Sequence, residues 1–206
     1  MLLPKTHALI CVLILLAITA TSPAHAVEKL GFTVVEQHKD LQIRRYPAHL
    51  LASVIVKGEF AEVGSEAFRP LFRFISGDNQ QQQKIAMTAP VLQRPASDGT
   101  GDAEPQSAKQ WVVSFVMPKT FNRNSLPDPD AKAITVTEEP ETLMATIEYR
   151  GGWSRERYES YYRQLLGQLE ETSYQPCGSP RWARHDPPMM PWFLRKNEIL
   201  LPVCSG

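Results

Sequence analysis

A strand–turn–helix pattern that occurs twice constrains the fold of this chain more than any other feature. In the first half, residues 41–56 alternate like a strand, residues 58–60 (GEF) form a turn, and apolar residues then recur at helical spacing. In the second half, residues 142–149 form the strand and 151–153 (GGW) the turn, and Ser154 is expected to cap a second helix. The apolar helical positions are Val63, Ala67, Leu71, Phe74 and Ile75 in the first half, and Tyr158, Tyr161, Tyr162, Leu165 and Leu169 in the second.

Two further strand candidates follow each helix and complete the repeated unit. They are residues 84–93 and 110–117 in the first half, and 181–185 and 192–203 in the second. Duplicated βαββ units favour an α+β domain that closes into one antiparallel sheet or barrel, with two helices outside or across it. Pro70 lies inside the first helical stripe, so we expect it to kink or divide that helix.

Residues 1–26 are typical of a secretory signal peptide. Lys5 gives a basic start, residues 8–20 are mostly apolar, and residues 24–26 (AHA) form a small-residue cleavage site. The apolar run is shorter than the roughly 20 residues that a membrane-spanning helix needs. We therefore expect cleavage after Ala26, export to the periplasm or beyond without a stable membrane anchor, and a single mature domain over residues 27–206.

Charge and cysteine content limit the partners and the stabilising chemistry. The chain has 22 basic and 22 acidic side chains, so neither sign dominates and we expect no nucleic-acid partner. Cys11 would leave with the leader, whereas Cys177 and Cys204 remain. An exported protein can oxidise this pair, and two buried free thiols are the alternative; the sequence leaves both open.

Common catalytic motifs are missing from the sequence. It contains no GxSxG elbow, Walker loop, GxGxxG fingerprint or HExxH pair, which favours a binding module over a hydrolase. Two histidines are candidate ligands for a haem iron, His49 in a strand beside Pro47 and His185 before the turn at residues 186–188. Each would act as a ligand only if it faced a cavity, and an edge or packing role is the alternative.

The first helix carries an aromatic pair with basic neighbours. Phe68 and Phe72 are four residues apart and project from one face, and Arg69 and Arg73 follow at the same spacing. Such an arrangement suits a flat apolar ligand that bears carboxylates, because rings stack and guanidinium groups pair with carboxylates. Met87 could add a thioether contact. The alternatives are that the rings fill the core and that the arginines are solvated.

Several segments, in this order, resemble the SOUL/haem-binding protein family. They are residues 41–47 (LQIRRYP), 68–77 (FRPLFRFISG), 84–91 (KIAMTAPV), 111–118 (WVVSFVMP) and 186–199 (DPPMMPWFLRKNEI). The resemblance implies that the duplicated βαββ units form a distorted antiparallel β-barrel flanked by two helices, akin to the GyrI-like effector-binding domains. It also implies non-covalent binding of b-type haem or another porphyrin in a shallow groove beside the first helix. Pocket roles fall on Phe68 and Phe72 and the propionate-facing role on Arg73, with no uniform axial histidine.

The expected partner is therefore a small-molecule tetrapyrrole, for which the protein would be a carrier or buffer. One alternative is a binder of other apolar or cationic molecules, as in GyrI-like domains; an inward Glu198 without propionate-binding arginines nearby would favour it. The other is a haem-modifying enzyme, which would need an ordered iron ligand and an open distal side.

Overall fold

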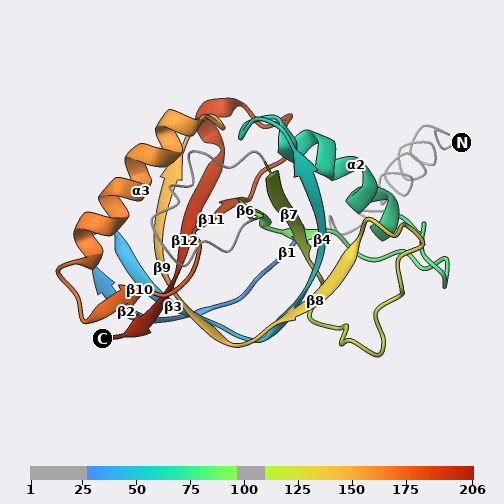
Figure 1. Ribbon diagram of the computed structural model, residues 1–206, viewed down its shortest axis with the longest axis horizontal. Helices are drawn as coiled ribbons and strands as arrows, with labels where there is room; N and C mark the ends of the chain where they lie inside the picture. Colours follow the sequence, from blue (N-terminus) through green and yellow to red (C-terminus); the bar gives the residue numbers. More distant parts are fainter. Residues whose placement is uncertain (1–26, 97–109) are drawn as a thin grey trace, which may run out of the picture.

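A strongly curved, mainly antiparallel sheet carries two helices on its outer face (Figure 1). The computed structural model describes residues 27–96 and 110–206. The main sheet has the strand order β2-β3-β9-β12-β11-β6-β7-β4-β8, and β10 pairs with β12 beside this path. The strands are β1 (Glu28–Lys29), β2 (Thr33–His38), β3 (Leu41–Tyr46), β4 (His49–Lys57), β5 (Thr88–Ala89), β6 (Val91–Pro95), β7 (Gln110–Val116), β8 (Thr135–Glu139), β9 (Thr142–Arg150), β10 (Tyr174–Pro176), β11 (Arg181–Arg184) and β12 (Lys196–Ser205); the helices are α2 (Val63–Ile75), α3 (Arg155–Leu169) and the 3-10 turn η2 (Trp192–Leu194).

The duplicated βαββ plan is confirmed by the strand pairing. In the unit β4-α2-β6-β7, the first strand pairs with the last and the last pairs with the middle one. The unit β9-α3-β11-β12 repeats this pairing. The two middle strands, β6 and β11, pair with each other and join the units into one sheet. The α+β fold class is therefore confirmed, with each helix following the first strand of its unit.

The predicted closed barrel is wrong, because the sheet is open. Its path ends at β2 and β8, and no pairing joins these two strands in the part of the chain that the structure describes. Closure depends on whether the two edges meet in space, which a pattern along the sequence does not report.

Prolines divide two of the predicted strands. Residues 41–56 form β3 and β4 with a break at Pro47, and residues 84–93 contain β5 and β6 on either side of Pro90. Proline has no backbone N–H to donate to a ladder, so pairing stops there. Residues 192–194 form the 3-10 turn η2, and the last strand begins only at Lys196.

The helices begin and continue for identifiable reasons. Gly58 and Gly151 precede α2 and α3 with φ values of 147° and 132°, a region that favours glycine. Ser154 caps α3 as expected, since its side chain accepts from the Arg157 backbone N–H at 3.3 Å. Pro70 does not divide α2, which is one helix from Val63 to Ile75. Burial of its apolar face against β4 and β7 outweighs the one hydrogen bond that Pro70 removes.

Alternation along the strands sorts the core into an outer and an inner part. Ile199 packs under α3, whereas its neighbour Leu200 belongs to a separate cluster on the inner face. Likewise, Ala52 packs under α2 and Leu51 lies in the inner cluster. The inner cluster consists of Tyr46, Leu51, Leu92, Val116, Met144, Ala183 and Leu200, with Leu30 packed against it.

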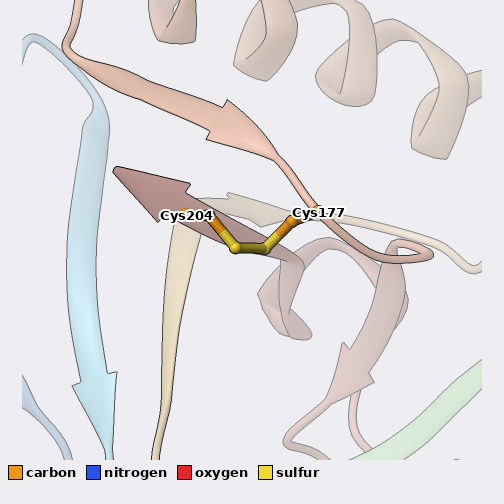
Figure 2. The surroundings of a disulfide bond; sticks show 2 residues. All are labelled: Cys177 and Cys204. Atoms are coloured by element: carbon orange, nitrogen blue, oxygen red, sulfur yellow. A yellow bond between two sulfur atoms is a disulfide. The ribbon is translucent and has the colours of Figure 1, made fainter. Parts of the chain in front are cut away.

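A disulfide joins Cys177 to Cys204 (Figure 2). The Cα atoms are 5.8 Å apart, and the bond ties the segment after β10 to the end of β12. Of the two alternatives that the sequence left open, the bonded pair is the one observed.

No helix in the described part of the chain combines the length and apolar character needed to cross a bilayer. The predicted signal peptide, residues 1–26, lies outside the described residues.

Candidate functional site

The outer face of α2 carries the aromatic pair that the sequence singles out. The rings of Phe68 and Phe72 stack with centroids 5.5 Å apart. Phe68 also contacts the ring of Phe115 edge-on at 5.5 Å, so it is anchored in the core beneath α2. Phe72 is 47% exposed and presents its ring to solvent. We call Phe68 and Phe72 the α2 shelf; it combines a fixed ring with an accessible one.

The basic and thioether candidates near the shelf are exposed. Arg69 is exposed, and the Arg73 guanidinium lies 2.7 Å from the Asp78 carboxylate just beyond the helix. Both partners of this pair are open to solvent, so the pair is weak and a ligand carboxylate could exchange with Asp78. Met87 is 36% exposed and lies in the segment between α2 and β5.

His49 lies at the start of β4, opposite Glu139 of β8, whose carboxylate pairs with Arg181. Its Nδ1 is 2.8 Å from the Pro47 carbonyl oxygen, and its Nε2 is buried without a hydrogen-bond partner among the described residues. Burial lowers the pKa of His49, which favours the neutral ring. The side chain lines an open groove of about 340 Å³ together with residues that include Leu50, Met117 and Phe121.

His185 follows β11 and is oriented by a buried carboxylate. Its Nε2 lies 2.7 Å from Glu198 Oε2, whereas Nδ1 is buried without a partner among the described residues. A carboxylate that holds one ring nitrogen is how proteins orient histidines whose other nitrogen binds a ligand. Within residues 27–96 and 110–206, no three His, Cys, Asp or Glu side chains gather as a metal centre.

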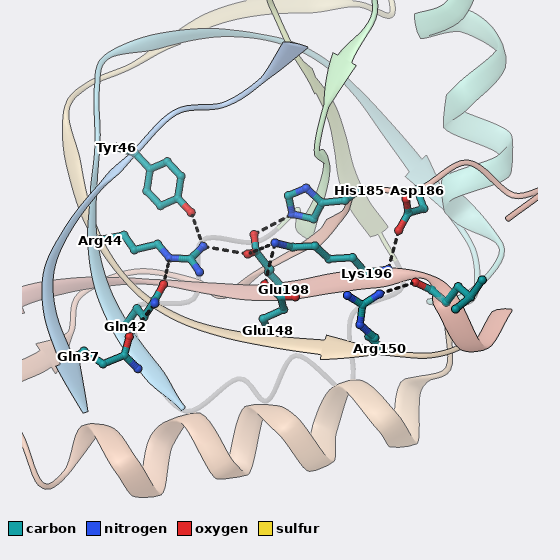
Figure 3. A network of polar contacts seen from close by, with 11 residues as sticks. Gln37, Gln42, Arg44, Tyr46, Glu148, Arg150, His185, Asp186, Lys196 and Glu198 are labelled. Carbon is teal, nitrogen blue, oxygen red and sulfur yellow. Dashed lines mark hydrogen bonds and ion pairs between the residues drawn. The ribbon is translucent and has the colours of Figure 1, made fainter. Parts of the chain in front are cut away.

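Glu198 is the centre of a charged network on the inner face of the sheet, opposite α3 (Figure 3). It is 2% exposed, and its Oε1 lies 2.9 Å from Arg44 and 3.3 Å from Lys196. Arg44 also donates to Gln42 at 2.6 Å, and Lys196 pairs with Glu148 at 2.7 Å. Burial alone would raise the pKa of Glu198, but the hydrogen bond and charge of His185, and then those of Arg44, lower it to about 2.

This network was largely missed by sequence reasoning. Glu198 was considered as a possible inward acid, but its partner Arg44 lies 154 residues earlier. Alternation along β3 places Gln42, Arg44 and Tyr46 on one face, and that signal was available. The sequence pattern did not show that β3 pairs with β9 and that β9 pairs with β12. These two pairings bring Arg44 to Glu198.

Solved structures of low sequence identity share the fold. The C-terminal domain of EcmrR aligns with a TM-score of 0.62 and 16% identity, over 81% of this chain and 98% of that one. An uncharacterized conserved protein from Listeria innocua gives 0.61 and 15%, over 81% and 93%. A hydrolase encoded by lin2189 of Listeria innocua gives 0.59 and 14%, over 82% and 94%. At these identities the likeness shows the fold alone, which is the α+β architecture described above.

Sequence comparison is more specific about the family. Among curated protein sequences, none matches this chain. A family model described as SOUL heme-binding protein matches residues 27–202, nearly all of the chain after the predicted leader. The matched span includes the α2 shelf, both candidate histidines and the Glu198 network. This chain therefore belongs to the SOUL heme-binding protein family.

Proposed function

We propose that this protein binds b-type haem or a related porphyrin non-covalently on the α2 shelf and acts as a carrier or buffer after export. The observation that carries the proposal is the exposed Phe72 ring stacked on the anchored Phe68, in a chain of a haem-binding family. An exposed ring on a fixed partner gives a flat ligand a surface whose geometry is already set.

Charge near the shelf fits the propionates of haem. Arg69 and Arg73 lie on the same helix, and the exposed Arg73–Asp78 pair can exchange its partner at low cost. An iron-bound histidine is not required by this arrangement. When bound, the cofactor would supply redox and ligand-binding chemistry at its iron, while the chain supplies stacking area and positive charge.

Binding of cationic molecules in the manner of GyrI-like domains is less well supported. Glu198 does point inward, but Arg44 and Lys196 already neutralise it and His185 holds its second oxygen. A cationic ligand would have to displace a buried guanidinium, which costs several kcal/mol. Glu198 is therefore part of a structural ion pair with Arg44 in this chain, and it is not free to bind a cationic ligand.

Titration of haemin into the purified mature protein tests the proposal. A saturable shift of the Soret band is expected for the wild type, and Phe72→Ala should weaken the binding. Ile55→Ala is a matched control, because Ile55 is also an exposed apolar residue, at 66%, but lies on β4. Equal haemin affinity of all three proteins would exclude the α2 shelf as the site.

A further inference from the structure

Arg184, the last residue of β11, is a buried cation without an acidic partner among the described residues. It is 7% exposed, its Nη2 donates to Gln93 Oε1, and its guanidinium lies over the rings of Trp182 and Trp153, 4.5 and 5.2 Å from their centroids. Burial lowers the pKa of Arg184 to about 10, so the group is still charged at neutral pH. A buried charge that only a neutral amide and two rings accompany is costly, and a bound anion would offset that cost.

Unpaired hydrogen-bond donors gather around this guanidinium. Tyr149, Asn197 and Arg184 are direct cross-strand neighbours on β9, β12 and β11. Within the described residues, no hydrogen bond is made by two buried donor atoms, Arg184 Nε and Trp153 Nε1, nor by one buried acceptor, Asn197 Oδ1. The Trp182 indole N–H is directed at the Tyr149 hydroxyl oxygen, so of these two groups only the hydroxyl proton is without an acceptor. Burial raises the pKa of Tyr149, so its hydroxyl keeps its proton and can donate. Since buried donors are normally paired, this excess of donors favours a ligand rich in acceptors.

The first turn of α2 adds a further attraction for an anion. Gly64 is the second residue of α2, and a Cβ placed there would collide with the Arg184 guanidinium. The positive end of the helix dipole thus lies near a cation, which favours an anion there. The carboxylates of the chain at this end of α2, Glu62 at the N-cap and Glu66 in the first turn, are exposed and leave the buried side open to a bound anion. A second guanidinium, that of Arg195, lies 4.3 Å from the centroid of the Trp153 ring.

We propose that Arg184, together with Tyr149, Trp153 and Trp182, forms a binding site for an oxyanion, a carboxylate or a phosphate, beside the first turn of α2. The guanidinium supplies the charge, and the Tyr149 hydroxyl and the Trp153 indole supply neutral donors. Trp182 donates to the Tyr149 oxygen and lies under the guanidinium. Gly64, Phe68 and Phe72 follow at four-residue intervals, about 6 Å apart along the helix axis. A carboxylate at Arg184 can therefore belong to a flat ligand on the α2 shelf; this last step rests on the proposed function.

Titration with free anions tests the site without haem. Inorganic phosphate and benzoate are titrated separately into the mature protein, and tryptophan fluorescence is recorded because Trp153 and Trp182 contact Arg184. At least one anion should give a saturable change, and Arg184→Met should weaken it by about ten-fold or more. Arg45→Met is the matched control, since Arg45 is exposed and paired with Glu141.

Tyr149→Phe keeps the test decisive if Arg184→Met fails to fold. It removes one donor and no charge, and we expect anion affinity to fall by roughly three- to ten-fold. If neither anion saturates in the wild type, or if both variants titrate like it, the free-anion site is wrong and ordered water is what satisfies these donors.

A pair of porphyrins tests whether the anion is a propionate. Haemin carries two carboxylates and iron octaethylporphyrin carries none, so the wild type should prefer haemin by about ten-fold or more. Arg184→Met should abolish that preference, whereas Phe72→Ala should weaken both porphyrins alike. If the preference survives in Arg184→Met, the propionate anchor is wrong although the shelf stands. If Phe72→Ala affects neither porphyrin, the shelf is wrong, and the phosphate and benzoate titrations still decide the anion site.

Discussion

At the scale of single residues, the Glu198 network makes stability depend on pH. The pKa of Glu198 falls from an ordinary 4.5 to about 2 in the folded protein. A depressed carboxyl pKa contributes stability above pH 4.5, and that contribution is lost as the pH falls towards 2. The loss is on the order of 3 kcal/mol. Urea unfolding at a series of pH values from 7 to 2 should show this decline.

Removal of the carboxylate should be more damaging than acid. Glu198→Gln leaves Arg44 buried without its partner, so we expect a loss of about 3–5 kcal/mol at pH 7 and a weaker dependence on pH below 5. Glu141→Gln breaks the exposed pair with Arg45 and should cost less than about 1 kcal/mol. Equal effects of the two substitutions would show that burial does not govern the Glu198 pair.

Residue-level prediction from the sequence succeeded where a single element holds the answer. Phe68 and Phe72 stack because both lie on α2, four residues apart, and this spacing is visible in the sequence. Arg44 and Glu198 meet through two strand pairings, and a third pairing places Arg184 beside Asn197, so none of these contacts follows from local spacing. Local rules give neighbours along an element, whereas strand order gives neighbours across the sheet.

At the scale of elements, α2 should contribute more to haem affinity than either histidine. The Phe72 ring can contribute roughly 1.5–3 kcal/mol when a ligand covers it. Phe72→Ala should therefore weaken haemin binding by more than about ten-fold, and Arg73→Ala by a similar or smaller factor. His49→Ala and His185→Ala should retain most of the affinity in Soret titrations. If one histidine substitution abolished the Soret shift while Phe72→Ala had no effect, an axial-histidine site would replace the shelf.

The sequence predicted the elements better than their closure. Both helices and the duplicated unit follow from periodicity, and the turn glycines Gly58 and Gly151 mark the start of each helix. The division of strands at Pro47 and Pro90 could have been anticipated from the missing N–H groups. The sequence could not have shown that β8 and β2 form the two open edges, since the edges are set by the curvature of the whole sheet.

At the scale of the whole molecule, export should define the mature N-terminus. Residues 24–26 form a small-residue cleavage site after a short apolar run, and we expect the exported protein to begin at Val27. Intact-mass measurement of protein recovered from the periplasm or medium checks this. A mass that includes Met1 would contradict cleavage. The Ala26→Arg substitution should block cleavage, because it removes the small residue at the cleavage site.

The disulfide links compartment to stability for the whole molecule. Cys177 and Cys204 are separated by 27 positions, and closing such a loop restricts the unfolded chain by about 3–4 kcal/mol. We expect Cys204→Ser to lower the free energy of unfolding by that order without changing the haemin site, because the bond lies at the end of β12 away from α2. Wild-type protein made without residues 1–26 in a reducing cytoplasm should show the same loss of stability. Air oxidation should then re-form the disulfide and restore the free energy of unfolding. Urea unfolding with thiol titration checks each step. Two free thiols in denatured, unreduced, exported protein would show that the bond does not form and that this part of the stability comes from packing alone.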